Sequence, residues 1–327
     1  MRLTYQKIYI MLDKFWVMPR LTQLELLEKY HELFTFVVEE PRIMPKGIAK
    51  KIGFSGQGKA RTTIMYHLEN MYEKKISMKP QICLKSFKET QTTAYFCKRK
   101  ANRGLFAMFK NLDRDPKINY AMCLSSSDFF LTSRDEDLHV KKYGLTVEEK
   151  SKLFTPQYPL PRNWKCDIDT ADRAFLNTTF KKGKIRRELY NGLDWDKLDW
   201  RIYDLIRGNI REKFTVIAEG ANTTSKTVKD HFFRRILPHC MQINYFFPKG
   251  YGNYLKTFIK IDSEFENSIG EGLRSLSSTN YLFPLERNIV IVLFHESIVK
   301  TLRLLEKMEE MAIIDGYLLY SVLASTG

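Results

Sequence analysis

The chain has 327 residues, 44% of them hydrophobic and 13% aromatic, so it can fill one large core or several smaller ones and is not a disordered chain. Lysine and arginine number 53 against 38 aspartates and glutamates, and the resulting net charge of +15 favours a polyanionic partner through counterion release. The five cysteines include no C-x-x-C pair, which excludes a zinc knuckle or a disulfide framework and fits a reducing cytoplasm.

Residues 1–20 are predicted to form an N-terminal extension. Its apolar stretch Ile8–Leu12 is followed at once by Asp13 and Lys14, with no small-residue cleavage site after it, so we expect no secretory signal. The longest apolar run near the C-terminus, Ile289–Phe294, has the length of a strand, whereas a membrane-spanning helix needs about 20 residues. We therefore expect a soluble, cytoplasmic protein without a membrane partner.

Residues 21–90 predict a first winged helix-turn-helix. Apolar spacing predicts a helix that ends near Pro41, a short second helix, and a third helix after the turn Gly53–Gly58. The strand-like sequence Ile76–Phe87 then suits a wing. The residues expected to be buried are Leu24, Leu27, Phe34, Val37, Val38, Ile48, Ala49, Ile52, Ile64, Leu68 and Met71.

The third helix of this unit has an open face that carries Lys59, Arg61, Thr62, Tyr66 and His67. In a helix-turn-helix the third helix fits the major groove of DNA, where its side chains meet base edges, and the second helix braces it. We therefore assign Lys59, Arg61, Thr62 and Tyr66 to DNA. A small helical packing module with a solvated charged face is the alternative interpretation of the same pattern.

Residues 91–134 predict the first four elements of a ferredoxin-like domain, whose full order is strand, helix, strand, strand, helix, strand. No further helix and strand are recognisable beyond Arg134, so we expect this first ferredoxin-like domain to be incomplete. Residues 135–190 hold several prolines and the basic run Lys181–Arg187, and we expect them to be an irregular connector. The predicted strand, helix and two hairpin strands lie at Thr93–Cys97, Arg103–Leu112, Ile118–Leu124 and Phe129–Thr132.

Residues 191–250 repeat the helix-turn-helix pattern. They predict a helix within Trp195–Arg207, a short helix at Thr215–Ala221 and a third helix at Lys226–Leu237 that Thr224 or Ser225 caps. The strand-like sequence Met241–Phe247 suits a second wing. The apolar residues expected to face inward are Leu198, Ile202, Leu205, Ile206, Val216, Ile217, Ala218, Val228, Phe232 and Ile236.

The open face of this third helix is basic and polar. We assign Ser225, Lys226, Thr227 and Lys229 to the groove of DNA, and we expect Arg234, Arg235 and the wings to meet phosphates, which position a protein without reading sequence. His231 is expected on the same open face.

Residues 251–327 predict a complete layer in the order strand, helix, strand, strand, helix, strand. This is the order of a ferredoxin-like domain. The fold class is therefore α+β, with two winged helix-turn-helix domains, each followed by a ferredoxin-like domain. The predicted elements are Tyr254–Asp262, Ser263–Leu276, Tyr281–Leu285, Ile289–Phe294, Ile298–Met311 and Tyr317–Leu323.

An internal repeat supports this organisation. The segment Ile118–Leu124 contains an Asn-Tyr pair, and so does Thr279–Leu285, 161 residues later. Each segment is followed by a short polar turn and a second apolar strand. The order strand, polar turn, strand on both copies indicates a duplicated folding unit.

The chain resembles the Lrp/AsnC (feast/famine) family of transcription regulators. The stretch Leu198–Ile206 resembles that family's opening helix and Phe214–Glu219 its second, with the likeness covering about residues 194–325 and, more weakly, 21–133. The resemblance implies binding of double-stranded operator DNA and a small effector, often an amino acid. It also implies that residues 251–327 are the domain for effector binding and dimerisation. The usual glycine-rich effector loop has no counterpart in this chain, so no effector residues are assigned.

Two units on one chain depart from the family's usual single unit. We therefore expect a pseudo-dimer in which two non-identical helices bind an asymmetric or imperfectly palindromic DNA site. Assembly of several chains through the sheet edges is open. We expect no enzymatic activity, no cofactor and no metal.

Two alternatives stay open. The sirohaem decarboxylases resemble the same two-unit architecture and carry a comparable Asn-Tyr, but they act through His and Arg, whereas Ile118 and Thr279 precede the two asparagines here. A plasmid-type replication initiator also has two winged helices in one basic chain. The six histidines form no pair at metal or acid-base spacing.

Overall fold

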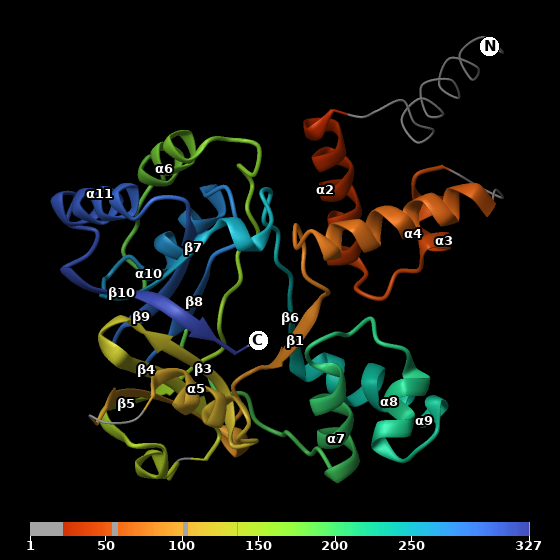
Figure 1. Ribbon diagram of the computed structural model, residues 1–327, viewed down its shortest axis with the longest axis horizontal. Coiled ribbons are helices and arrows are strands. Elements are labelled where there is room, and N and C mark those ends of the chain that lie inside the picture. Colours follow the sequence, from red (N-terminus) through yellow and green to blue (C-terminus); the bar gives the residue numbers. More distant parts are fainter. Residues whose placement is uncertain (1–21, 54–57, 101–103, 136, 327) are drawn as a thin grey trace.

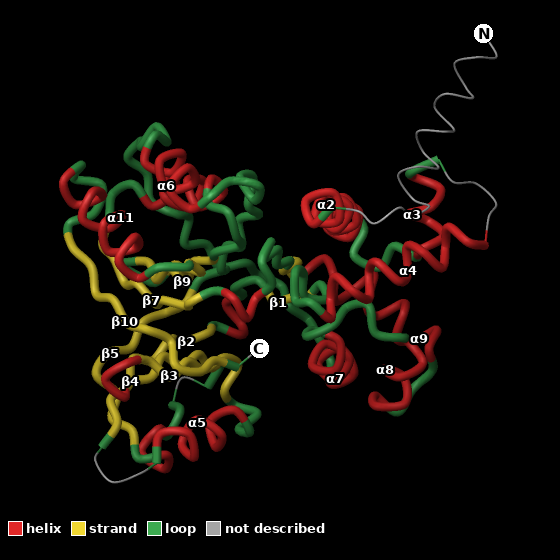
Figure 2. The backbone as a smooth tube through the Cα atoms, turned by 45° about the horizontal axis from the view of Figure 1, so that its top comes forward, coloured by secondary structure: helices red, strands yellow, loops and turns green. Residues whose placement is uncertain are grey.

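The computed structural model describes residues 22–53, 58–100, 104–135 and 137–326. The protein is mixed α and β: an eight-stranded antiparallel sheet forms one end of the molecule, and two helical units lie together at the other (Figure 1). Figure 2 shows the short strand β1 between the two ends. The predicted N-terminal extension, residues 1–20, lies outside the described residues.

The eight-stranded sheet is built from two halves of four strands. The first half has the order β5-β2-β4-β3 and the second the order β10-β7-β9-β8, and β3 pairs with β10 between them. In each half the first and third strands along the chain are central, and the fourth and second flank them. The strands are β2 (Thr92–Arg99), β3 (Ile118–Leu124), β4 (Asp128–Ser133), β5 (Leu145–Leu153), β7 (Leu255–Asp262), β8 (Tyr281–Pro284), β9 (Ile289–His295) and β10 (Gly316–Ser325).

The last strand of each half crosses to the other half. β10 pairs first with β7 and then, from Val322 onward, with β3. β5 likewise pairs with β2, and the chain then bridges to the end of β8 through Leu153 and Leu285. The residues that these last strands reach in the other half, Leu124 and Leu285, are 161 positions apart, so the two crossings are equivalent. Together they connect both edges of the sheet and close it.

The closed sheet encloses an aromatic core, because alternate residues of a strand point to the same face. Phe130 of β4 lies 5.1 Å from the ring centre of Phe258 and 5.6 Å from that of Phe283. All three side chains are buried. Burying each such side chain stabilises the fold by roughly 1.5–3 kcal/mol.

Helices cover the outer faces of the sheet. Ser297 caps α11, and the buried stripe of this helix, which includes Leu304 and Met308, packs on the second half. Figure 1 shows α6 beside α11 on that side, and the first half is covered by α5. The bounds are α5 (Leu105–Asp113), α6 (Ile168–Leu176), α10 (Glu266–Gly272) and α11 (Ile298–Glu310).

The first helical unit consists of α2 (Gln23–Glu39), α3 (Pro45–Lys51) and α4 (Gly58–Glu73). Thr22 and Glu25 form a capping box that satisfies two free backbone N–H groups at the start of α2. The unit's core contains Leu33, Ile64 and Leu68, all of which the apolar spacing predicted to be buried except Leu33.

The second helical unit consists of α7 (Lys197–Ile206), α8 (Phe214–Ala221) and α9 (Ser225–His231), and a π-helical segment at Phe232–Ile236 extends α9. Asn222 ends α8 with a φ of 55°, a left-handed conformation that asparagine tolerates better than most residues. The core contains Ile202, Ile217 and Phe232.

Two short strands, β1 (Gln81–Leu84) and β6 (Cys240–Ile243), join the helical units. Gln81 pairs with Ile243, and Ile82 pairs with Gln242. Gln242 and Ile243 stand 161 positions after Gln81 and Ile82, so the two pairs are equivalent by the internal repeat. Ile82 packs in the core of the second unit, and Phe246, just after β6, packs in that of the first. Each unit therefore contributes a segment to the core of the other.

The structure corrects three expectations. The strands predicted as wings, within Ile76–Phe87 and Met241–Phe247, pair with each other instead of forming separate wings. The first half does have a fourth strand, β5, in the region expected to be an irregular connector, and α6 lies there too. Its second helix is replaced by a single 3-10 turn at Val140–Tyr143.

Most other bounds agree with the sequence pattern. The strands and helices of the two sheet halves begin and end within two residues of the predicted ranges, apart from the helix expected at Ser263–Leu276, which is shorter as α10. Among the described residues, no helix is both long enough and apolar enough to cross a membrane.

Candidate functional site

The third helix of the first unit, α4, buries one face and exposes the other. Ile64, Leu68 and Met71 are buried, so Arg61, Thr62 and Tyr66 are exposed on the opposite side. Tyr66 is 57% exposed. Lys59 belongs to α4, but its side chain lies outside the described part of the structure.

The third helix of the second unit, α9, begins with a cap. The Thr224 hydroxyl accepts the backbone N–H of Thr227 at 3.1 Å and lies 2.9 Å from the Thr227 hydroxyl. Ser225 and Thr227 are therefore half-buried next to the cap, whereas Lys226 and Lys229 are exposed. Arg234, in the segment that extends α9, is also exposed.

Arg235 and His231 have internal partners. Asp199 of α7 is fully buried, and its carboxylate accepts from His231 Nδ1 at 2.7 Å and from Arg235 Nε at 2.8 Å. The hydrogen bond to Asp199 raises the pKa of Arg235. Both side chains were expected on the open face, and both contact α7 instead of being free: His231 is largely covered, whereas Arg235 stays 35% exposed.

The same carboxylate belongs to a group that has metal-ligand chemistry. Asp196, Asp199 and His231 each offer a ligand atom within 4.8 Å of the others. However, Asp199 also accepts the backbone N–H of Asp196 at 3.0 Å in a capping box. All strong contacts of this carboxylate are therefore with the protein, and a cation would have to displace Arg235.

His67 was expected on the open face of α4, and this expectation is also wrong. The side chain is 1% exposed and lies edge-on to Tyr30, with 6.1 Å between ring centres. Burial lowers the pKa of His67 to about 4, aided by the positive charges of Lys29 and Lys74. His67 is thus a neutral core residue.

A group of tyrosines lies inside the closed sheet, where the repeated Asn-Tyr pairs meet. The Tyr120 hydroxyl lies 2.8 Å from that of Tyr281, the equivalent residue 161 positions later. Tyr158 and Tyr245 pack beside them, with ring centres 5.8 Å apart. Burial raises the pKa of all four hydroxyls, so they are neutral hydrogen-bonding groups at physiological pH.

Lys256 lies at the edge of this tyrosine group. Its ammonium donates to Ser325 Oγ at 2.8 Å and lies 5.4 Å from the ring centre of Phe294 and 5.9 Å from that of Tyr281. Burial lowers the pKa of Lys256 to about 8. An amine with such a pKa can exchange a proton near neutral pH.

A cavity of about 290 Å³ lies at the junction between the first helical unit and the sheet. Val38 and Leu160 form apolar walls, and Tyr158 connects the cavity to the tyrosine group. Its other lining residues, Gln242, Asn244 and Arg274, are polar or charged. The cavity is open to solvent and is therefore a surface depression rather than an enclosed ligand site.

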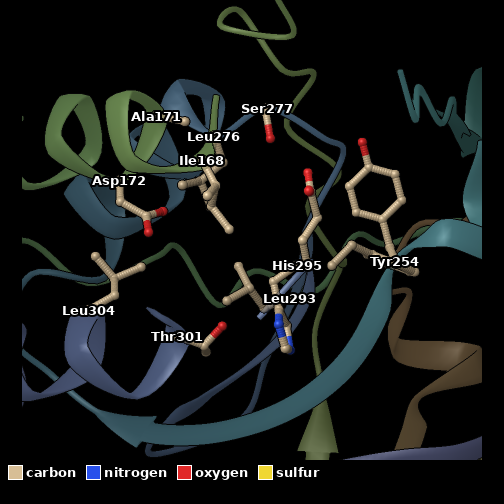
Figure 3. A pocket seen from close by; sticks show the side chains of 12 residues that line it. Ile168, Ala171, Asp172, Tyr254, Leu276, Ser277, Leu293, His295, Thr301 and Leu304 are labelled. Carbon is tan, nitrogen blue, oxygen red and sulfur yellow. The ribbon is translucent and has the colours of Figure 1, made fainter. Parts of the chain in front are cut away.

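A second, much smaller cavity of about 20 Å³ lies between α6, α11 and the end of β9, with Asp172, His295 and Thr301 around it (Figure 3). Burial raises the pKa of Asp172 to about 6, and the charge of Asp169 adds to this rise. His295 Nε2 lies 2.6 Å from Thr257 Oγ1. This volume fits about one water molecule and excludes a metabolite.

Sequence reasoning missed several of these groups. Asp199 sits on the apolar stripe of α7, and an acid on such a stripe was a signal for an internal charge pair. The meeting of Tyr120 and Tyr281 could have been expected once the repeat was recognised, because equivalent strands of a pseudo-dimer face each other. No local signal marked Lys256, whose environment comes from distant strands.

The comparisons with known proteins identify a likeness of fold. A crystal structure of the siroheme decarboxylase NirDL covers 91% of this chain and 91% of its own, with a TM-score of 0.50 at 11% identity. A second structure of that enzyme, in co-complex with an iron-uroporphyrin III analogue, covers 90% and 92%, with a TM-score of 0.48 at 10% identity. No family model and no curated protein matches the chain.

This likeness corrects the expectation that the chain is not an enzyme. The solved structure that shares the fold over nine-tenths of both chains is an enzyme. The fold of this chain is therefore one that an enzyme also has, and it gives no ground for excluding an enzyme.

Proposed function

We propose that α4 and α9 bind neighbouring major grooves of double-stranded DNA, and that the protein regulates transcription by sequence-specific DNA binding. The observation that supports this most is the exposure of basic and polar side chains on both third helices, which share one end of the molecule. Arg61 and Tyr66 on α4, and Lys226 and Lys229 on α9, are the groups available to base edges or phosphates.

The electrostatics of these helices favour a polyanion. The first turns of α4 and α9 contain no acidic residue, and the N-terminal end of a helix carries a partial positive charge. The exposed Arg234 adds to the charge of the second unit. Because the two helices differ in sequence, the proposal includes two unequal half-sites.

A double substitution, Lys226→Ala with Lys229→Ala, tests the proposal. Binding to a duplex selected from a random library should weaken by at least about tenfold, because each contact to a base edge contributes roughly 1–3 kcal/mol. The measurement is a titration by fluorescence anisotropy at two salt concentrations. Neither lysine takes part in the cap or in the Asp199 network, so the fold should be unaffected.

The matched control removes two exposed lysines at the sheet end, Lys110→Ala with Lys141→Ala. This control lowers the net charge by the same amount as the test variant. Its affinity for the duplex should stay within about twofold of that of the unmodified protein, since exposed charges far from the DNA are screened. Equal losses in both variants, or no loss in either, would reject the assignment to α9.

The sheet end supports a second candidate function, decarboxylation of a tetrapyrrole. It is favoured by the fold shared with a siroheme decarboxylase and by the buried tyrosine group beside Lys256, whose pKa of about 8 suits proton transfer. Ile118 and Thr279 stand where that resemblance implies a histidine. The proton donor would therefore be Lys256 or a tyrosine.

Absorbance spectra with added sirohaem test this candidate. Binding in the sheet end should shift the absorption of the tetrapyrrole, and Lys256→Met should abolish loss of carboxyl groups measured by mass spectrometry. The control Lys260→Met removes a lysine of the same strand that pairs with Glu149 instead. An unchanged sirohaem spectrum at saturating protein would eliminate the decarboxylase candidate. It would have no bearing on the proposed DNA binding.

A further inference from the structure

The two helical units are joined by a reciprocal pair of arginines. Arg42, between α2 and α3, donates to the backbone carbonyls of Ile210 and Glu212, the two neighbours of Arg211. Arg211, between α7 and α8, donates at 2.8 Å to the carbonyls of Pro41 and Ile43, the two neighbours of Arg42. Each arginine therefore binds the loop that carries the other, and we call this arrangement the arginine clasp.

The clasp requires the planar guanidinium fork. One side chain spans two carbonyls that are two residues apart, which an ammonium group cannot do with the same geometry. The Arg42 guanidinium also stacks on the ring of Phe214, 3.8 Å from its centre. Both arginines are half-buried, and no carboxylate among the described residues forms an ion pair with either. Their partners are thus backbone carbonyls, whose positions are fixed by the loops.

The clasp adds to two other reciprocal connections. β1 and β6 pair symmetrically, and each unit receives a core residue, Ile82 or Phe246, from the chain segment that follows the other. Units of one chain usually move relative to each other unless their interface is extensive. Here, three separate connections act on the same pair of units.

We propose that Arg42 and Arg211 are positioning residues that fix the separation of α4 and α9. In combination with the proposed DNA binding, on which this consequence rests, the chain would accept two half-sites at one spacing only. Neither arginine needs to touch DNA for this effect. Units without the clasp would still bind each half-site but would tolerate a changed spacer.

A distance measurement tests the clasp without DNA. Spin labels are attached through an unnatural amino acid at the exposed positions Lys50 of α3 and Glu219 of α8, which avoids the native cysteines. The full-length protein should give one narrow distance distribution. Arg42→Lys with Arg211→Lys, which keeps the charge, should broaden it at least twofold; the single variant Arg42→Lys serves if the double variant fails to fold.

The matched control is Arg201→Lys, because Arg201 donates to the carbonyl of Gly220 within the second unit alone. This variant should keep the narrow distribution. An equally narrow distribution in the clasp variants would overturn the proposal.

DNA binding then supplies the second measurement. With the selected duplex, inserting three base pairs between half-sites should weaken binding by the unmodified protein at least tenfold and by the clasp variants less than threefold. If no variant binds any duplex while the clasp variants show the broadened distribution, the proposed DNA binding fails and the positioning role stands. Equal sensitivity to the insertion in all variants would overturn the consequence for spacing.

Discussion

The two helical units share their fold but hold their third helices by different chemistry. In the second unit, the buried Asp199 binds His231 and Arg235. In the first unit, the aligned burial patterns put Tyr30 in the place of Asp199 and His67 in that of His231. The rings of Tyr30 and His67 meet in a T-shaped contact, so the equivalent contact contains no carboxylate.

This difference shows that duplication preserved packing and not charge. A neutral aromatic contact tolerates the loss of a polar group, whereas a buried carboxylate that accepts hydrogen bonds from two side chains does not. In the second unit, α9 is therefore held by directional hydrogen bonds. In the first unit, α4 is held by the packing of rings. The two helices should respond differently to substitution and to pH.

The largest expected effect is that of Asp199→Ala. This change leaves Arg235 and His231 without their acceptor and removes half of a capping box, so it should lower the free energy of unfolding by about 3–4 kcal/mol. Tyr30→Phe, the equivalent change in the first unit, should cost at most about 1 kcal/mol. Urea denaturation measures both, and equal losses would contradict the comparison.

A smaller effect concerns pH and the first unit. The folded protein holds the pKa of His67 at about 4, below the usual value of 6.5, so the unfolded chain binds the proton more readily. Stability should be fully present above pH 6.5 and fall by about 3 kcal/mol as the pH drops to 4.

His67→Phe should remove this part of the pH dependence, which unfolding curves at several pH values would detect. A titration of the ring followed by NMR checks the pKa directly. Protonation of His67 near pH 6.5 in the folded protein would show that the first unit is not held by a neutral contact.

The smallest effect is expected where the two halves are equivalent. Tyr120→Phe and Tyr281→Phe each remove one hydroxyl of the hydrogen bond that the two residues share, so each should cost about 1 kcal/mol. The double variant should cost little more than either alone, because the same bond is lost only once. Additive losses in this double-mutant cycle would mean that each hydroxyl has an independent partner.

The sequence predicted the elements whose burial follows a regular period. The buried stripes of α4 and α9 lie where the apolar spacing put them. In contrast, β5 was missed, since its middle residues Glu148, Glu149 and Lys150 are charged and exposed. Its strand conformation depends on pairing with β2, which local composition does not report.

For the candidate site, the exposed lysines of α9 followed from the periodicity, whereas the roles of Arg235, His231 and His67 did not. A helix wheel separates a buried from an exposed face, but it cannot tell that an arginine near the border has a carboxylate within reach on another helix. Asp199 supplied that carboxylate from 36 residues away along the chain.

By itself, the amino-acid sequence determined the duplication, the helical and strand periods and the positive charge, because each of these is a property of residues and their near neighbours. Only the tertiary structure decided which segments became partners: β1 with β6, Arg42 with the loop of Arg211, and Tyr120 with Tyr281. These contacts join positions more than 150 residues apart. They form only when both copies fold and close around a common axis, which no local pattern encodes.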